Sequence, residues 1–186
     1  MKNSVKQAQS IVGTSSGRPK DDFYPTPAYV TEALLQKEEF FDPILEPACG
    51  DGAISKVLLQ NRYVVRSYDL HNHGYGIFPV DYLSYNAYPP SYTMITNPPF
   101  SLFSEFVKKS ILLGFNKFAL FGKLSILEGK VRSKLLEETH LTRVHVFRSR
   151  VQLTRNGETA TNSGMIAFAW FVWVRGNIGS PIIDWI

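Results

Sequence analysis

The stretch EPACGDG, Glu46–Gly52, follows a short apolar strand pattern around Ile44–Leu45 and precedes a helical pattern over 53–60. Gly50 and Gly52 permit tight turns and let a ligand approach the main chain closely, and the first turn of the following helix offers free amides. The stretch lacks both the G-x-G-x-x-G spacing of dinucleotide sites and the Lys-Ser/Thr of a P-loop. It therefore predicts a strand–loop–helix ligand site that need not hold a pyrophosphate.

Strand and helix patterns alternate on both sides of this loop. Helices are expected over 28–39, 53–60, 101–113 and 128–139, and strands around 44–45 and over 63–70, 92–97, 117–122, 141–151 and 164–174, with a further short strand within 77–83. Alternation of this kind predicts an α/β fold, with a mostly parallel sheet covered by helices on both faces. The last two strand patterns have no helix between them, which predicts an antiparallel pair.

Composition limits the class of protein. The chain has 186 residues, of which 44% are hydrophobic and 19% charged, as in a globular protein. Residues 1–20 are polar and rich in Ser and Gly, so we expect a mobile tail before one domain over 21–186. The longest apolar run, Met165–Val174, is about half of the roughly 20 residues that a membrane-spanning helix needs. Without a signal-peptide core, a soluble, cytoplasmic protein with no membrane partner is expected.

Two acidic residues end predicted strands on the same side of the sheet as the glycine loop. Asp69 comes about twenty residues after Gly50, the spacing at which an acid binds ribose hydroxyls in dinucleotide folds. Asp81 ends the next strand pattern. Either residue alone is more often a simple turn residue. Together with the glycine loop they predict a nucleoside pocket, with one acid for the ribose and one for an adenine amine.

The sequence TNPPF, Thr96–Phe100, ends the strand pattern over 92–97. Pro98 and Pro99 cannot donate to a sheet ladder and stiffen the chain, so Asn97 and Phe100 are presented in one fixed shape. An Asn-Pro-Pro-aromatic sequence directly after a strand is rare by chance. A stiff turn with Phe100 in the core is the structural alternative.

These motifs, in this order, resemble those of class I S-adenosylmethionine-dependent methyltransferases, in particular the branch that includes DNA N6-adenine methyltransferases and their small bacteriophage forms. The resemblance covers Tyr24 to about Val174 and implies a Rossmann-like, seven-stranded sheet with a reversed last strand. It also implies an S-adenosylmethionine site, with Thr26 near the methionine carboxylate. The implied cofactor residues are Tyr24, Thr26, Glu46, Ala48, Cys49, Gly50, Asp51, Asp69, Leu70, Asp81, Tyr82 and Asn97.

The chemistry of amine methylation fits the NPPF residues, which we call the clamp (Asn97, Pro98, Pro99 and Phe100). An exocyclic adenine amine is a weak nucleophile because its lone pair is delocalised into the ring. The Asn97 side-chain oxygen and the Pro98 carbonyl can accept both amine hydrogens and direct the lone pair toward a methyl donor. Phe100 offers a face on which a flipped-out base can stack. The four clamp residues are therefore the predicted catalytic set.

Positive charge is concentrated after the clamp. Residues 101–155 carry 11 basic and 4 acidic residues, a net of +7, whereas residues 1–100 carry a net of −2. A solvated helix face would explain this, but clustered cations also suit a phosphate backbone. We expect Lys123, Arg150, Arg155 and Asn156 to contact the substrate. DNA is the favoured partner and RNA the second. Because no long insertion is present, sequence specificity is expected to be short, relaxed, or supplied by a protein partner.

Other interpretations stay open at this point. The cluster HNHG, His71–Gly74, could suggest a metal site but is more typical of a loop beside the pocket, and no metal is expected. Cys49, the only cysteine, could be a nucleophile but fits better as a small packing residue. Trp170 and Trp173 are expected in the core. Similar clamps act on RNA adenine, cytosine N4 and protein glutamine, and a non-catalytic cofactor- or partner-binding protein is the rival outside enzymes. If the chain is phage-encoded, its location is the bacterial host cytoplasm.

Overall fold

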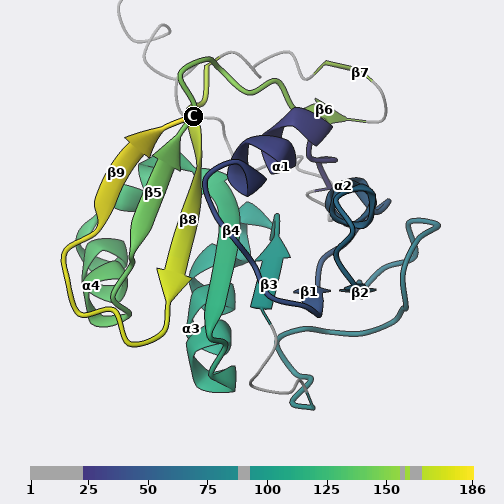
Figure 1. Ribbon diagram of the computed structural model, residues 1–186, viewed down its shortest axis with the longest axis horizontal. Coiled ribbons are helices and arrows are strands. Elements are labelled where there is room, and N and C mark those ends of the chain that lie inside the picture. The colour runs from purple at the N-terminus through teal and green to yellow at the C-terminus, as the bar shows by residue number, and fades with distance from the viewer. Residues whose placement is uncertain (1–22, 88–92, 156–157, 160–164) are drawn as a thin grey trace, which may run out of the picture.

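The computed structural model describes residues 23–87, 93–155, 158–159 and 165–186, and its centre is a seven-stranded sheet of order β2-β1-β3-β4-β8-β5-β9 (Figure 1). A separate two-stranded sheet pairs β6 with β7. The predicted tail, residues 1–20, lies outside the described residues. The elements are α1 (Ala28–Leu35), β1 (Ile44–Glu46), α2 (Ala53–Gln60), β2 (Val65–Ser67), β3 (Thr93–Thr96), η1 (Phe100–Leu102), α3 (Phe103–Leu113), β4 (Lys117–Lys123), η2 (Leu124–Leu127), α4 (Lys130–Glu138), β5 (Arg143–Val146), β6 (Thr154–Arg155), β7 (Glu158–Thr159), β8 (Phe168–Val174) and β9 (Ile182–Trp185).

The directions of the strands confirm the predicted mixed sheet. Strands β2, β1, β3 and β4 are parallel, β8 is antiparallel to both β4 and β5, and β9 is parallel to β5. The reversed strand, β8, therefore lies between β4 and β5, and the predicted antiparallel pair near the end of the chain is confirmed. The carboxyl ends of β1, β3, β4 and β5 consequently lie at one edge of the sheet, which we call the carboxyl edge.

The short strand predicted within 77–83 is wrong. Only an isolated parallel bridge between Tyr68 and Ile77 forms there, after which Val80 donates its N–H to the Asp69 carbonyl. Pro79 has no N–H for a ladder, which explains why the pairing does not extend. The seventh strand is instead β9, a segment for which no strand is predicted. Because Ile77 pairs with Tyr68, just beyond the end of β2, Asp81 a few residues later still lies at the same cavity as Asp69.

Helices cover both faces of the sheet, as predicted. Phe103, Phe106 and Val107 of α3 pack with Leu136 of α4 against one face, in a cluster that includes Met94, Phe118, Leu120 and Trp173. Side chains of α1 and α2 cover the other face, and that cluster includes Val30, Leu34, Ile54, Leu58, Ile95, Ala119, Phe121 and Trp170. Neighbours in β3 and β4 alternate between the two clusters because successive strand side chains point to opposite faces. Trp170 and Trp173 are buried in the core, as predicted.

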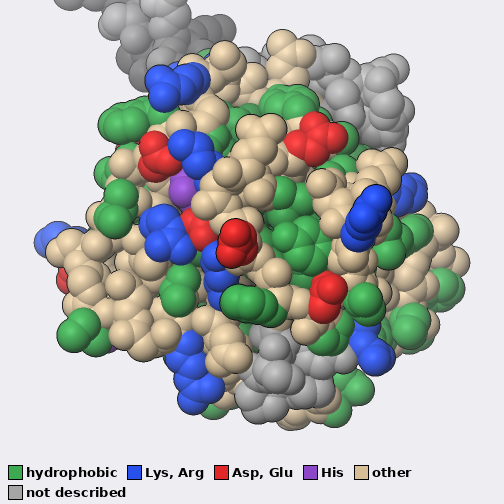
Figure 2. Space-filling view, viewed as in Figure 1, with side chains coloured by type: hydrophobic (Ala, Val, Ile, Leu, Met, Phe, Trp, Pro, Cys, Tyr) green, Lys and Arg blue, Asp and Glu red, His purple; other side chains and the backbone are tan. Residues whose placement is uncertain are grey.

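A buried carboxylate holds the segment after α1 to the sheet. Glu38 is 4% exposed and accepts hydrogen bonds from Arg143, from Lys117 at 2.6 Å and from His145 at 2.8 Å. Figure 2 shows blue and red side chains gathered on this face, near α1, β5 and β9. Burial by itself would raise the pKa of Glu38, but the hydrogen bonds from His145, Arg143 and Lys117 lower it well below its ordinary value. The far end of α1 is thus tied to β4 and β5.

Among the described residues, no helix combines the length and apolar content needed to cross a bilayer.

Candidate functional site

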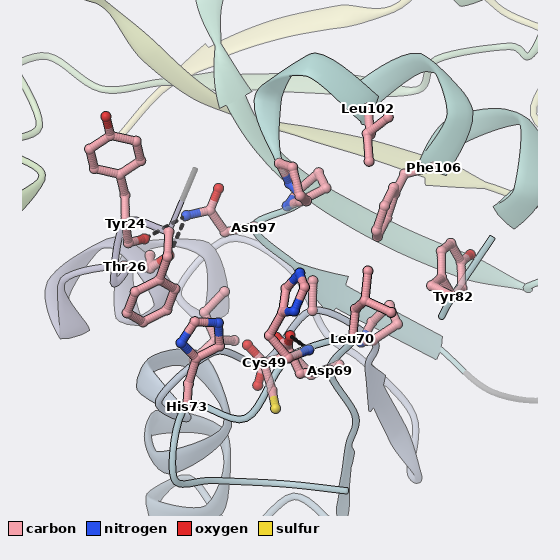
Figure 3. A pocket seen from close by; sticks show the side chains of 18 of the residues that line it. Tyr24, Thr26, Cys49, Asp69, Leu70, His73, Tyr82, Asn97, Leu102 and Phe106 are labelled. Carbon is pink, nitrogen blue, oxygen red and sulfur yellow. Dashed lines mark hydrogen bonds between the residues drawn. The ribbon is translucent and has the colours of Figure 1, made fainter. Parts of the chain in front are cut away.

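A cavity of about 270 Å³ opens at the carboxyl edge, where the glycine loop, the segment after β2 and the clamp converge (Figure 3). Its wall thus comes from parts of the sequence that lie far apart along the chain. The described residues that line it are Phe23, Tyr24, Pro25, Thr26, Glu46, Pro47, Ala48, Cys49, Asp51, Ala53, Ile54, Asp69, Leu70, His71, His73, Val80, Asp81, Tyr82, Leu83, Asn97, Pro98, Pro99, Phe100, Ser101, Leu102 and Phe106.

Asp69 ties the glycine loop to the loop that follows β2. One of its carboxylate oxygens accepts the Gly50 N–H and the other accepts the His71 N–H, both at 2.8 Å. Gly50 has φ +54, and a Cβ at this position would collide with the Phe23 ring. A side chain is therefore excluded here both by backbone conformation and by packing. By accepting hydrogen bonds from both loops, the Asp69 carboxylate holds the floor of the cavity in place, and its side chain also lines the cavity.

Burial raises the pKa of two side chains in the glycine loop, those of Glu46 and Cys49. Glu46 is buried and accepts a hydrogen bond from Ser55; burial, together with the charges of Asp69 and Asp51, raises the pKa of its carboxyl well above the usual range. Burial is the largest cause that raises the pKa of the Cys49 thiol to about 12, and the acidic residues near it contribute to this rise. A thiol with this pKa is a weak nucleophile at neutral pH, which supports the packing interpretation of Cys49.

Asp81, Tyr82 and Leu70 form the adjoining wall. Asp81 is exposed, and its side chain accepts the Leu83 N–H at 2.9 Å, which shapes the turn. Tyr82 is buried, packs on Phe106 and shares a 2.8 Å hydrogen bond with Ser110 of α3. Leu70 is 49% exposed at the cavity rim. Asp81, Tyr82 and Leu70 thus line the cavity with one acid beside two largely apolar side chains.

The amide group of Asn97 has a fixed orientation. Its Nδ2 donates to the Tyr24 carbonyl at 3.1 Å and to the Thr26 hydroxyl at 3.0 Å, as Figure 3 shows. Because a carbonyl oxygen can only accept, the nitrogen must be the atom that faces Tyr24. Both amide hydrogens are used in these bonds. The side-chain oxygen, an acceptor, is directed elsewhere.

Phe100 begins η1 and is half-buried beside the cavity. Its ring packs on Phe168 at 5.6 Å between centroids and on Tyr24 at 6.3 Å, and the Lys123 ammonium lies 5.0 Å from its centroid. Lys123, the last residue of β4, is thereby brought next to the clamp although it does not line the cavity. The core alternative for Phe100 is thus only partly realised, because its ring also borders the cavity.

Of the other predicted substrate residues, Arg150 does not line the cavity. Arg150 is exposed beyond the end of β5, at the carboxyl edge. Arg155 is in β6, which Figure 1 shows with β7 on the side of α1 and α2. Asn156 lies outside the described residues. The structure therefore groups the predicted cofactor and catalytic residues closely, with Lys123 next to the clamp and Arg150 at the same edge of the sheet.

Several lining residues have no counterpart in the predicted set. The Phe23 ring stacks on His73 at 4.3 Å, and His71 and His73 line the cavity, which confirms that HNHG is a loop beside the pocket. Phe106 reaches the cavity from α3, and helical periodicity marks it only as a core residue. Within the described residues, no group of three or more His, Cys, Asp or Glu side chains could hold a metal ion.

The chemistry of the wall selects the kind of ligand that fits. Four acids line it, namely Glu46, Asp51, Asp69 and Asp81, together with aromatic rings and apolar side chains. None of the described lining residues is lysine or arginine. The three aspartates and the aromatic rings of this wall suit a ligand with positive charge and a flat ring, because carboxylates and aromatic faces both attract cations, whereas the buried Glu46 offers a neutral carboxyl. The wall is unsuited to a pyrophosphate.

Comparison with known proteins establishes the fold. No family model and no curated sequence matches the chain. Solved structures do match. One described as the modification subunit of a type I restriction enzyme from Vibrio vulnificus YJ016 has a TM-score of 0.58 at 15% identity, over 95% of this chain and 48% of that one. The chain therefore spans about half the length of that subunit.

A second match is the 23S rRNA methyltransferase ErmE, with a TM-score of 0.55 at 13% identity over 81% of this chain and 67% of that one. A third is a Pyrococcus horikoshii protein described as an RNA methyltransferase, with a TM-score of 0.57 at 12% identity over 94% of this chain and 98% of that one. The fold is that of class I methyltransferases. In this methyltransferase fold the cavity lies at the carboxyl ends of the strands, the place where open α/β sheets bind ligands. At these identities the likeness concerns the fold and leaves the substrate undetermined.

Proposed function

We propose that the protein is an S-adenosylmethionine-dependent methyltransferase that modifies an exocyclic amine of a nucleic-acid base. Its substrate is DNA, and the nitrogen that receives the methyl group is N6 of adenine. The observation that carries this proposal is the fixed amide of Asn97. Its nitrogen is held by Tyr24 and Thr26, so its oxygen is the group available to a target amine, beside a cavity suited to a cationic nucleoside.

The residues of the cavity fit S-adenosylmethionine. The loop from Glu46 to Asp51 would hold the methionine part, while Asp69 and Asp81 would hold the ribose and the adenine amine. Acidic side chains suit the ammonium and sulfonium charges, and Tyr82 and Phe106 offer apolar surface to the adenine ring. When bound, this cofactor supplies an electrophilic methyl group, whose bond to sulfur breaks with its electron pair as the bond to the amine nitrogen forms.

The clamp supplies orientation in place of a strong base. The Asn97 oxygen and the Pro98 carbonyl accept the two hydrogens of the target amine, which draws its nitrogen toward a tetrahedral geometry. The lone pair then points into the cavity, and one amine proton passes to water after transfer. Phe100 offers its ring to the flipped base, with the Lys123 ammonium beside it.

Three cations share the carboxyl edge of the sheet with the clamp. Lys123 ends β4, and Arg148 and Arg150 are exposed beyond the end of β5. In contrast, Lys117 and Arg143 begin their strands and are bound to Glu38. Among these five cations, position therefore separates an edge group that suits a phosphate backbone from an interior pair that stabilises the fold.

Replacing Arg150 by glutamine should weaken DNA binding and make the slope of log affinity against log salt shallower by about 0.9 for each phosphate that the variant no longer neutralises. Fluorescence anisotropy at several salt concentrations measures this slope. Arg175→Gln is the matched control, because Arg175 is exposed just after β8, which ends at the opposite edge of the sheet. A salt-independent interaction in the unmodified protein would favour a protein substrate.

Replacing Phe100 by leucine, which keeps an apolar side chain without an aromatic face, should lower methyl transfer to duplex DNA about 10- to 100-fold, since stacking of one base contributes roughly 1–3 kcal/mol. Phe100→Tyr should retain most of the activity. The defect should shrink on a duplex whose target adenine is mismatched, because less unstacking remains to be offset. Initial rates on both substrates test this, and equal defects would contradict base flipping.

Transfer of a labelled methyl group to DNA, RNA and protein in parallel, followed by nucleoside analysis, tests the proposed function. We expect N6-methyladenine in DNA. Methylated adenine in RNA alone would change the substrate but keep the chemistry. Binding of the cofactor without transfer to any of the three would favour the non-catalytic alternative and overturn the proposal.

A further inference from the structure

We propose that Thr26 is a positioning residue for Asn97, and that its hydroxyl acts in the methyl-transfer step through this asparagine. The inference rests on the proposed function and deepens it. It differs from the role that family resemblance implies for Thr26, which is contact with the methionine carboxylate of the cofactor. The observation is the 3.0 Å hydrogen bond from Asn97 Nδ2 to Thr26 Oγ1.

A carboxamide needs outside partners to define its orientation, because its oxygen and nitrogen ends have nearly the same shape. If the Asn97 side chain rotated by half a turn, its NH₂ group would face the target amine and both would be donors. Its oxygen would then face the Tyr24 carbonyl, and two acceptors repel each other. The Tyr24 carbonyl, which can only accept, therefore selects the one orientation in which the clamp can accept a hydrogen from the substrate, and the second bond, to the Thr26 hydroxyl, holds the amide in that orientation.

The Thr26 hydroxyl is placed rigidly enough to serve this purpose. Thr26 is 4% exposed and lies between Pro25 and Pro27, which restrict the backbone on both sides. Helix α1 begins directly after Pro27, and its Val30 carbonyl accepts the indole N–H of Trp170 at 2.8 Å. Because Trp170 belongs to β8, the hydroxyl and the clamp are fixed to the same sheet.

The position of Asn97 also explains why this hydrogen bond concerns the substrate more than the cofactor. Asn97 follows β3 directly and begins the clamp, whereas the acidic residues expected to bind the cofactor follow β1 and β2. The segment from Tyr24 to Thr26 reaches Asn97 across 71 residues of sequence. The role of Thr26 is therefore one that local sequence does not reveal.

Thr26→Val, which keeps the shape and removes the hydroxyl, should lower the turnover number about tenfold or more and leave the dissociation constant of S-adenosylmethionine within about threefold, as expected when a positioning hydrogen bond is removed. Thr26→Ser should restore most of the turnover. Thr31→Val is the matched control, because Thr31 is fully buried on α1 and its hydroxyl has no hydrogen-bond partner within the described structure. This control should leave turnover unchanged.

Calorimetry with S-adenosylmethionine and single-turnover methyl transfer measure the two quantities separately. A raised dissociation constant with unchanged turnover in Thr26→Val would overturn the inference in favour of the carboxylate role. Hydrogen exchange of the Asn97 side-chain amide, followed by NMR, gives a readout without activity and should be several-fold faster in Thr26→Val. Unchanged exchange would also overturn the inference. Absence of methyl transfer in the unmodified protein would instead refute the proposed function, while the exchange measurement would still test Thr26.

Discussion

Replacing Asn97 by alanine should lower the turnover number by about 100-fold or more while the dissociation constant of S-adenosylmethionine stays within about threefold. The side-chain oxygen of Asn97 is the acceptor that its own hydrogen bonds leave for the target amine. Without it the amine keeps its planar geometry, and its lone pair remains delocalised into the ring. The acids and the glycine loop that would hold the cofactor are unchanged in this variant.

Asn97→Asp separates orientation from the mere presence of an acceptor. Aspartate keeps an oxygen toward the substrate but turns a second oxygen toward the Tyr24 carbonyl, which repels it. We therefore expect its turnover to be low as well, although its size matches asparagine. Single-turnover kinetics with saturating cofactor measure the effect, and thermal unfolding shows whether the fold is kept. Near-normal turnover in Asn97→Ala would remove Asn97 from the catalytic step.

Replacing Glu38 by glutamine should lower the free energy of unfolding at neutral pH by about 3–5 kcal/mol, the usual effect of removing one member of a buried ionic network. The side chains of Glu38 and Lys117 are 3% and 12% exposed, so water cannot compensate Lys117 when the carboxylate is removed. The control is Glu39→Gln, because Glu39 is the next residue but is exposed. That variant should change stability by less than about 0.5 kcal/mol.

The contribution of Glu38 depends on pH in a defined direction. Its pKa in the folded protein is lower than the ordinary value of about 4.3 that it regains on unfolding. Its stabilisation is therefore complete above about pH 5 and is lost as the pH falls below the ordinary value toward the depressed one. Urea unfolding of the unmodified protein and Glu38→Gln from pH 7 to pH 3 should show a difference that is constant at first and then shrinks. A difference that grows in acid would contradict this role.

The sequence by itself determined the alternation of most strands and helices and the side of the sheet on which the site lies, but not strand β9 or the absence of a strand within 77–83. Alternating strand and helix patterns imply parallel strands, whose carboxyl ends share an edge, and the motifs EPACGDG and NPPF each follow a strand. Glycine and proline act on the backbone within a few residues, so their effects are visible locally. For the same reason Pro79 argues, from sequence alone, against the strand expected within 77–83.

The tertiary structure alone decided which distant groups meet. Asn97 is oriented by Thr26 across 71 residues, and Glu38 is held by His145 across 107. Strand β9 forms beside β5 although its four residues give only a weak local pattern. Such pairings depend on how the chain is threaded through the sheet, and periodicity carries no information about partners at that separation. Local sequence thus determined the site's chemical groups, and only packing at long range determined how the amide of Asn97 is oriented.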